Sequence, residues 1–191
     1  MIDKKFIRQL KKDYDVSESE RRQIISLANI VLHSSKRAIF SLHRGQIQTA
    51  KDLLAEIEKI LMQMHKKFGY YRLTQEGAYK AGAEEYVEAK MFYRLTAGQK
   101  VEEIKEIQLN QESLVAGICD LTGELVRLAI NQAAAGKLNE AGKIKKMIDE
   151  IMGELVQFDM TGYLRTKYDQ AKMNLRKIEQ INYEIKIRTI K

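Results

Sequence analysis

Two acidic residues spaced for one helix face stand in the middle of the chain, within Cys119-Asp-Leu-Thr-Gly-Glu-Leu-Val-Arg127. Asp120 and Glu124 are four residues apart, and Arg127 follows three residues later, so the three side chains share one face of a helix. Leucines in nearly the same steps, one residue later, form an apolar stripe beside them. A row of carboxylates directly beside a buried apolar stripe differs from an ordinary solvent-exposed helix face.

A second pair of acids, Glu85 and Glu88, is three residues apart in an apolar setting. Glu84 lies about 100° further round the same helix, and we expect it to be solvated. Two carboxylates from one helix that face two from another make an oxygen-only site. Such a site suits Mg²⁺ or Mn²⁺, which prefer hard oxygen ligands.

The spacing also allows a second interpretation, in which these acids pair with Lys or Arg across helices. Arg127 is one candidate partner. A di-iron site is disfavoured, because a bundle of that kind needs Glu-x-x-His on its helices. The three histidines, His33, His43 and His65, are far from both acidic pairs in the sequence.

The composition predicts an all-α protein. The 191 residues include no Pro and no Trp, good helix formers dominate, and nothing alternates with period two. Ser17 and Glu20 form a capping box that predicts a helix start. The expected helices of a single domain spanning 1–191 cover 2–14, 17–44, 46–68, 70–95, 111–135, 138–158 and 163–188. The polar stretch before 111 adds at most a partial turn, through Val101, Ile104 and Ile107.

Cysteine usage and hydropathy indicate a cytoplasmic protein without membrane contact. The single cysteine, Cys119, has apolar neighbours and is expected to fill the core. One cysteine excludes an internal disulfide and fits a reducing compartment. No apolar run approaches membrane-spanning length, and the N-terminus lacks a signal-peptide core.

The net charge of +7 is unevenly distributed. Residues 1–44 carry ten Lys and Arg against five acids, and residues 163–191 carry eight against three, so each end has +5. The middle, 45–162, is left with −3. Basic ends around an acidic middle suggest a polyanion held near an acidic centre.

Several segments resemble the translin family, and most closely its translin-associated factor X branch. Glu85-Tyr-Val-Glu-Ala89 and Asp120-Leu-Thr-Gly-Glu-Leu125 are similar to the two acidic motifs of that branch. Ser35-Lys-Arg-Ala-Ile-Phe-Ser-Leu-His-Arg44 resembles its N-terminal basic helix, and Arg127-Leu-Ala-Ile-Asn131 resembles a segment that both branches share. Leu164-Arg-Thr-Lys-Tyr-Asp169 resembles the start of the last helix of the family.

The resemblance implies a bundle of about seven helices that assembles into a closed shell and binds single-stranded RNA and DNA. It implies that Glu85, Glu88 and Asp120 are catalytic ligands of Mg²⁺, with Glu124 beside them, in an endoribonuclease that cuts single-stranded RNA. The alternative is a non-catalytic binding protein like the translin branch. The chain lacks the longer loops of eukaryotic members, so it resembles a minimal prokaryotic member. We expect a homo-oligomer of six to eight subunits, with a translin-like paralogous subunit as a further partner.

Basic residues near aromatic ones are the candidate nucleic-acid contacts. The expected RNA-binding residues are Lys36, Arg37, His43 and Arg44 on the basic helix, and Lys66, Lys67 and Arg72 around Phe68-Gly-Tyr-Tyr71. For Arg127 two roles stay open, a counter-ion for the acids or a phosphate contact.

Overall fold

The computed structural model describes residues 1–189, and all regular structure in that range is helical. The all-α class and the number of helices, seven among the described residues, are confirmed. The last two residues of the expected domain, 190–191, lie outside the described residues. The helices are α1 (Lys4–His43), α2 (Ile47–Phe68), α3 (Tyr70–Thr74), α4 (Gly77–Thr96), α5 (Gln111–Ala134), α6 (Leu138–Leu155) and α7 (Gly162–Thr189).

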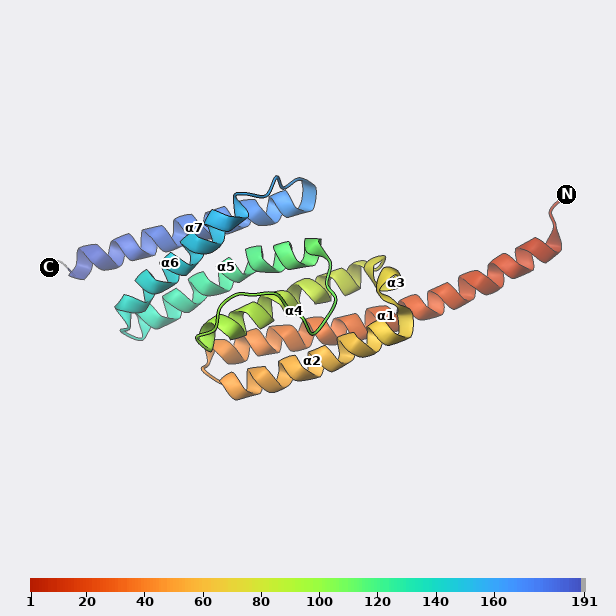
Figure 1. The fold of residues 1–191 in the computed structure, drawn as a ribbon, viewed down its shortest axis with the longest axis horizontal. Helices are drawn as coiled ribbons and strands as arrows, with labels where there is room; N and C mark the ends of the chain where they lie inside the picture. The colour runs from red at the N-terminus through yellow and green to blue at the C-terminus, as the bar shows by residue number, and fades with distance from the viewer. Residues whose placement is uncertain (190–191) are drawn as a thin grey trace.

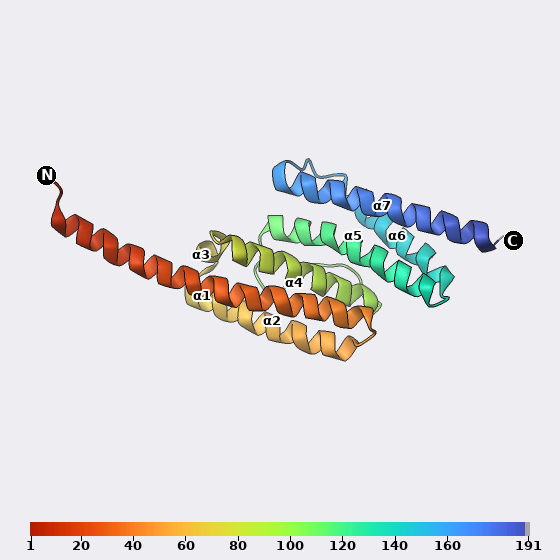
Figure 2. The same ribbon diagram turned by 180° about the vertical axis from the view of Figure 1, so that it is seen from behind.

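The helices form two groups that meet along α4 and α5 (Figures 1 and 2). Helices α1, α2 and α4 pack on one another, and α5, α6 and α7 pack on one another. The apolar stripes of all these helices merge in one buried cluster, in which Tyr86, Phe92 and Leu121 are fully enclosed. Residues at the crossing of α4 and α5 therefore stand between the two groups.

The expected break between 2–14 and 17–44 is wrong, because α1 is a single helix of 40 residues. Its N-cap is Asp3, whose carboxylate accepts hydrogen bonds from the backbone N–H of Lys5 and Phe6. No Gly or Pro separates Tyr14 from Ser17, so nothing interrupts the helical backbone there. The first turns of α1 project from the body as an exposed arm (Figure 1).

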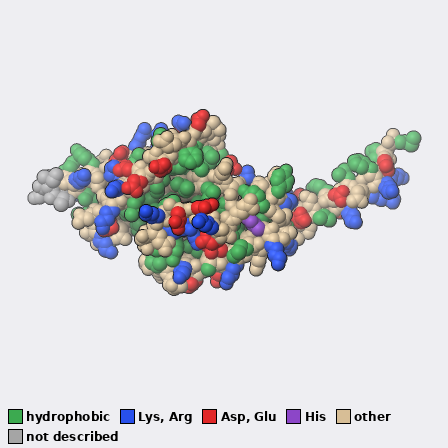
Figure 3. All heavy atoms as spheres, in the orientation of Figure 1, with side chains coloured by type: hydrophobic (Ala, Val, Ile, Leu, Met, Phe, Trp, Pro, Cys, Tyr) green, Lys and Arg blue, Asp and Glu red, His purple; other side chains and the backbone are tan. Residues whose placement is uncertain are grey.

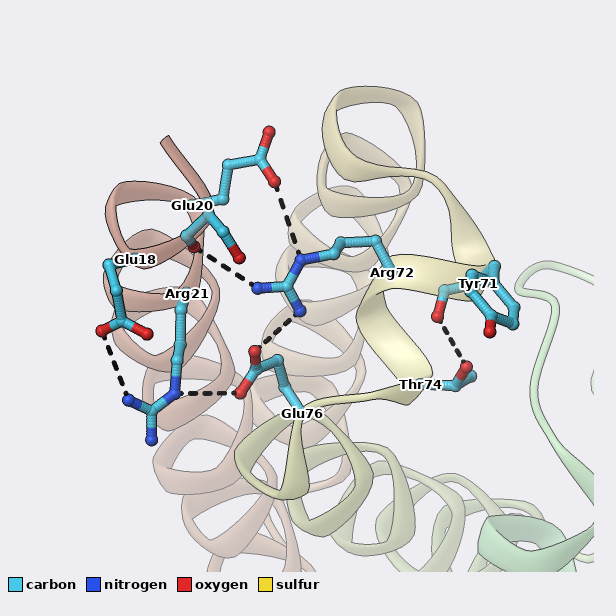
Figure 4. A network of polar contacts seen from close by, with 8 residues as sticks. Glu18, Glu20, Arg21, Tyr71, Arg72, Thr74 and Glu76 are labelled. Atoms are coloured by element: carbon cyan, nitrogen blue, oxygen red, sulfur yellow. Dashed lines mark hydrogen bonds and ion pairs between the residues drawn. The ribbon is translucent and has the colours of Figure 1, made fainter. Parts of the chain in front are cut away.

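The single helix expected over 70–95 is divided into α3 and α4 by a turn at Gln75 and Glu76. The Thr74 hydroxyl donates to the Tyr71 carbonyl, and the Glu76 N–H donates to the Leu73 carbonyl, which closes the first helix early. The turn is then held by Arg72, whose guanidinium lies 2.7 Å from Glu76 and 3.6 Å from Glu20 of α1 (Figure 4).

The segment between α4 and α5 contains no helix, so the partial turn expected there is absent. Ile104 and Ile107 are nevertheless buried in the core. The guanidinium of Arg94 donates hydrogen bonds to the carbonyls of Glu102 and Glu103, at 2.5 and 3.3 Å. These bonds satisfy loop carbonyls that a helix would have paired internally.

Cys119 is buried, as expected for a core filler, and burial raises the pKa of its thiol to about 11. Among residues 1–189, no helix combines the length and apolar character that crossing a bilayer requires.

Candidate functional site

A close approach of α4 and α5 brings the two acidic pairs together. The approach depends on Gly117, where a Cβ atom would lie 2.7 Å from the Val87 side chain and 2.8 Å from the Glu84 carbonyl oxygen. Only a residue without a side chain fits at that distance. The negative charges of Asp120 and Glu124 on α5 act on Glu85 and Glu88 on α4, so the two acidic pairs lie near one another at this crossing. These four acids and Glu84 are called the acid cluster below.

Glu88 is the acid of this cluster on which burial and neighbouring negative charges act together to raise the pKa most clearly. Burial, and then the charges of Glu85, Asp120 and Glu124, raise the pKa of Glu88 to about 9. Burial also raises the pKa of Glu85, and the negative charges of Asp120 and Glu124 add to that effect. The four acids that the sequence singled out are thus within electrostatic reach of one another.

Glu124 is bound by His43, which the sequence analysis had placed far from the acids. The imidazole Nε2 forms a short hydrogen bond with the Glu124 carboxylate, and the His43 ring lies 4.9 Å from that of Phe92. Burial alone would raise the pKa of Glu124, but His43 and Arg127 lower it. Only 4% of the His43 side chain is exposed, so His43 packs against the acid cluster and does not contribute to the outer surface.

Asp120 is bound by Lys167 of α7, a residue that the sequence analysis missed. The Lys167 ammonium lies 2.5 Å from Asp120 and 3.8 Å from Glu84. The Tyr163 hydroxyl, one turn earlier on α7, donates to Glu84 at 2.6 Å. Glu84 is therefore buried, and the expectation that it would be solvated is wrong. The four-residue spacing of Tyr163 and Lys167 was the available signal, since it puts both on one face of α7.

The remaining acid with a cationic partner is Glu85, whose carboxylate lies 3.9 Å from the Lys36 ammonium. Three of the four predicted ligands are therefore held by cations from α1, α5 or α7. Within residues 1–189, no three His, Cys, Asp or Glu side chains stand in the arrangement of a ready-made metal site. The donors still fit Mg²⁺ chemically, because they are all carboxylates and Mg²⁺ in proteins commonly uses one or two of them and keeps several waters.

Of the basic residues expected near the C-terminal end of α1, Lys36 contacts Glu85 of the acid cluster and His43 contacts Glu124. Arg37 and Arg44 are exposed, and more than half of the Lys36 side chain is exposed. The Arg44 guanidinium lies 4.2 Å from the ring centre of Phe40, which is itself 47% exposed. This edge of α1 combines positive charge with an accessible aromatic ring.

The second expected basic group lies about 20 Å away along the bundle, because Lys67 contacts Gln23, thirteen residues before Lys36 on α1. Lys66 and Lys67 are exposed. Arg72 is engaged in the ion pairs with Glu20 and Glu76 that join α1, α3 and α4 (Figure 4). The two basic groups are thus separate in the structure. Arg72 forms ion pairs within the protein.

Arg127 lies 3.5 Å from Glu124, with half of its side chain exposed. The structure therefore shows it as a counter-ion for the acid cluster. Its exposed part remains free to approach a ligand. On the face drawn in Figure 3, acidic and basic side chains stand side by side over the middle of the body.

The fold is that of a translin-like helical protein. The sequence profile of the Translin family matches residues 9–189, and the chain belongs to that family. It is 23% identical to Translin-associated protein X of Mus musculus over 226 aligned residues, which cover 95% of this chain and 77% of that protein.

Two solved structures share the fold across nearly all of the chain. The crystal structure of apo-NeC3PO superimposes with a TM-score of 0.85 at 20% identity, covering 97% of this chain and 98% of that one. The complex of AfC3PO with duplex RNA superimposes with a TM-score of 0.83 at 18% identity, covering 96% and 98%. At these identities the likeness establishes the fold.

Proposed function

We propose that this protein is a metal-dependent endoribonuclease that cuts single-stranded RNA. The observation that carries the proposal is the meeting of Glu85, Glu88, Asp120 and Glu124 across α4 and α5. Carboxylates gathered at such cost in repulsion are characteristic of sites that bind a cation. Membership of the Translin family and the likeness to a protein solved with RNA support a nucleic acid as the ligand.

The four carboxylates would hold one or two Mg²⁺ ions, or Mn²⁺. Bound metal supplies a water of lowered pKa and offsets negative charge on the phosphate oxygens. Glu88 would give up its proton on binding, since its raised pKa reflects burial and repulsion that a cation relieves. His43 keeps the Glu124 carboxylate oriented, and Lys167 does the same for Asp120.

The cations around the acid cluster would position the RNA backbone. Lys36 and Arg37 lie on α1, Arg44 caps the C-terminal end of α1, and Arg127 lies on α5. Phosphate contacts of this kind set the position of a strand without reading its sequence. A strand lying across these residues has its phosphodiester next to the carboxylates, where cleavage would occur.

Cleavage of a labelled single-stranded RNA in the presence of Mg²⁺ tests the proposal. We expect cleavage to stop with EDTA. It should also stop in Asp120→Asn and in the double variant Glu85→Gln with Glu88→Gln, while both variants still bind the RNA. Unchanged cleavage in both variants would remove the acid cluster from the reaction. A duplex RNA of the same sequence, included in parallel, shows whether single strands are preferred.

The second candidate function is that of a non-catalytic protein that binds single-stranded RNA or DNA. It is favoured by the ion pairs of Glu85, Asp120 and Glu124, because such pairs also occur in purely structural networks. Binding of RNA without cleavage at any Mg²⁺ or Mn²⁺ concentration would select this function.

We further propose that the protein acts as a closed homo-oligomer of six to eight subunits, with a translin-like paralogue as an optional partner. The arm of α1 supports oligomerisation, because Phe6, Leu10 and Tyr14 are each more than half exposed. A monomer rarely leaves such a row of large apolar residues in water. Light scattering of the purified protein measures the subunit number.

A further inference from the structure

Phe40 is an exposed aromatic residue on the edge of α1 that borders the acid cluster. On a helical wheel it stands about 40° from Lys36 and about 60° from His43, and it lies between them along the helix axis. Lys36 contacts Glu85, and His43 contacts Glu124. Phe40 therefore lies about one helical turn from each of two residues that touch the predicted ligands.

The surroundings of Phe40 are positively charged. His33, Lys36, Arg37 and Ser41 line a shallow hollow with the ring, and Arg44 lies over the ring at 4.2 Å. Residues 21–51 contain no Asp or Glu, and the acid that contacts this edge of α1 is Glu85, through Lys36. The combination of an exposed aromatic ring with cations is the one that binds unpaired nucleotides, through base stacking and phosphate contact.

We propose that Phe40 is a stacking platform for an unpaired nucleobase, next to the phosphodiester that lies at the acid cluster. The base stacks on the pair formed by the Phe40 ring and the Arg44 guanidinium. Lys36 and Arg37 bind the adjacent phosphates. This inference rests on the proposed function, and it adds a reason for single-strand preference. A base inside a duplex is covered by its neighbours, so it cannot lie flat on the ring.

The test is the affinity of the full-length protein for a short fluorescent oligo(A), measured by anisotropy in EDTA so that no cleavage occurs. Phe40→Ala should weaken binding about tenfold. Phe40→Trp should retain the affinity, and Phe40→Leu should lose it, because Leu keeps the apolar volume and lacks the ring. Phe158→Ala is the matched control, since Phe158 is 55% exposed, follows α6 and belongs to neither basic group.

An abasic strand of the same length separates stacking from charge. On that strand Phe40→Ala and the unaltered protein should bind equally, and both should show the same salt dependence. Equal oligo(A) affinities for Phe40→Leu and the unaltered protein would overturn the proposal. So would a change of oligomeric state in Phe40→Ala with unchanged affinity, because Phe40 would then contact a second copy of the chain. An unaltered protein that binds no oligo(A) would contradict the proposed function itself.

Discussion

The Lys167 ammonium lies 2.5 Å from Oδ2 of Asp120, at the position where a metal-binding carboxylate would otherwise meet its ion. The contact joins α7 to α5, and 3.8 Å separates the same ammonium from Glu84 on α4. Burial alone would lower the pKa of Lys167, but the hydrogen bond and charge of Asp120 raise it. The acid cluster thus contains a permanent cation of its own.

Replacing Lys167 by Met should tighten binding of Mn²⁺ about tenfold or more, because a positive charge beside Asp120 repels a divalent cation. Calorimetric titration of the metal into the protein measures the affinity. Lys167→Arg keeps the charge and should bind Mn²⁺ as the unaltered protein does. Equal or weaker binding by Lys167→Met would show that the contact only supports packing.

The buried Glu88 should make the metal-free protein less stable as the pH rises. The pKa of Glu88 is about 9 in the folded protein, against an ordinary value of 4.5. Between these values the folded state binds more protons than the unfolded state, so the free energy of unfolding falls with increasing pH. The Glu88→Gln variant has no ionisable group at this position, so its free energy of unfolding lacks this decrease with pH. We expect it to gain about 1–3 kcal/mol over the unaltered protein between about pH 5 and about pH 9.

Urea unfolding in EDTA at the two pH values measures the change, and addition of Mg²⁺ provides the control. A cation that binds the acid cluster should restore the stability of the unaltered protein at high pH and do little for Glu88→Gln. Parallel pH profiles for the two proteins would show that Glu88 is ionised without penalty.

Replacement of Gly117 by Ala should separate α4 from α5. Its Cβ atom would lie 2.7 Å from Val87 and 2.8 Å from a backbone oxygen, and backbone cannot move aside without shifting a helix. We expect a loss of about 1–3 kcal/mol of stability and weaker metal binding. Gly153→Ala on α6 is the matched control, because no atom lies within 4 Å of its Cβ position. It should stabilise the protein slightly, since Ala favours a helix more than Gly does. Equal effects of the two substitutions would argue against a tight crossing.

The two basic groups should behave differently in RNA binding. Lys36→Ala with Arg37→Ala should weaken binding to single-stranded RNA and reduce the salt slope by about 1.4, as expected for two lost phosphate contacts. Arg72→Met should leave the affinity nearly unchanged and cost about 1 kcal/mol of stability, because it breaks the ion pairs with Glu20 and Glu76. Affinity at several salt concentrations and thermal unfolding measure the two effects. A salt slope of the Lys36 and Arg37 variant equal to that of the unaltered protein would reject this face as the binding surface.

Helix content and most helix ends could be predicted from the sequence, because apolar periodicity and glycines are local signals. Gly45 and Gly69 adopt positive φ where the first long helices were expected to end. The long α1 and the turn between α3 and α4 were missed. The capping signal at Ser17 does not start a new helix, because no Gly or Pro interrupts the backbone before it. The turn between α3 and α4 is held partly by the contact of Arg72 with Glu20, which is distant in sequence.

The sequence by itself determined that the chain is helical and that Glu85, Glu88, Asp120 and Glu124 stand on helix faces, since helical spacing follows from residue order alone. Only the tertiary structure decided that these faces meet and which cations accompany them. The Gly117 crossing sets how closely α4 and α5 approach. His43 and Lys167 reach the acids from helices remote in sequence, and such pairings depend on packing.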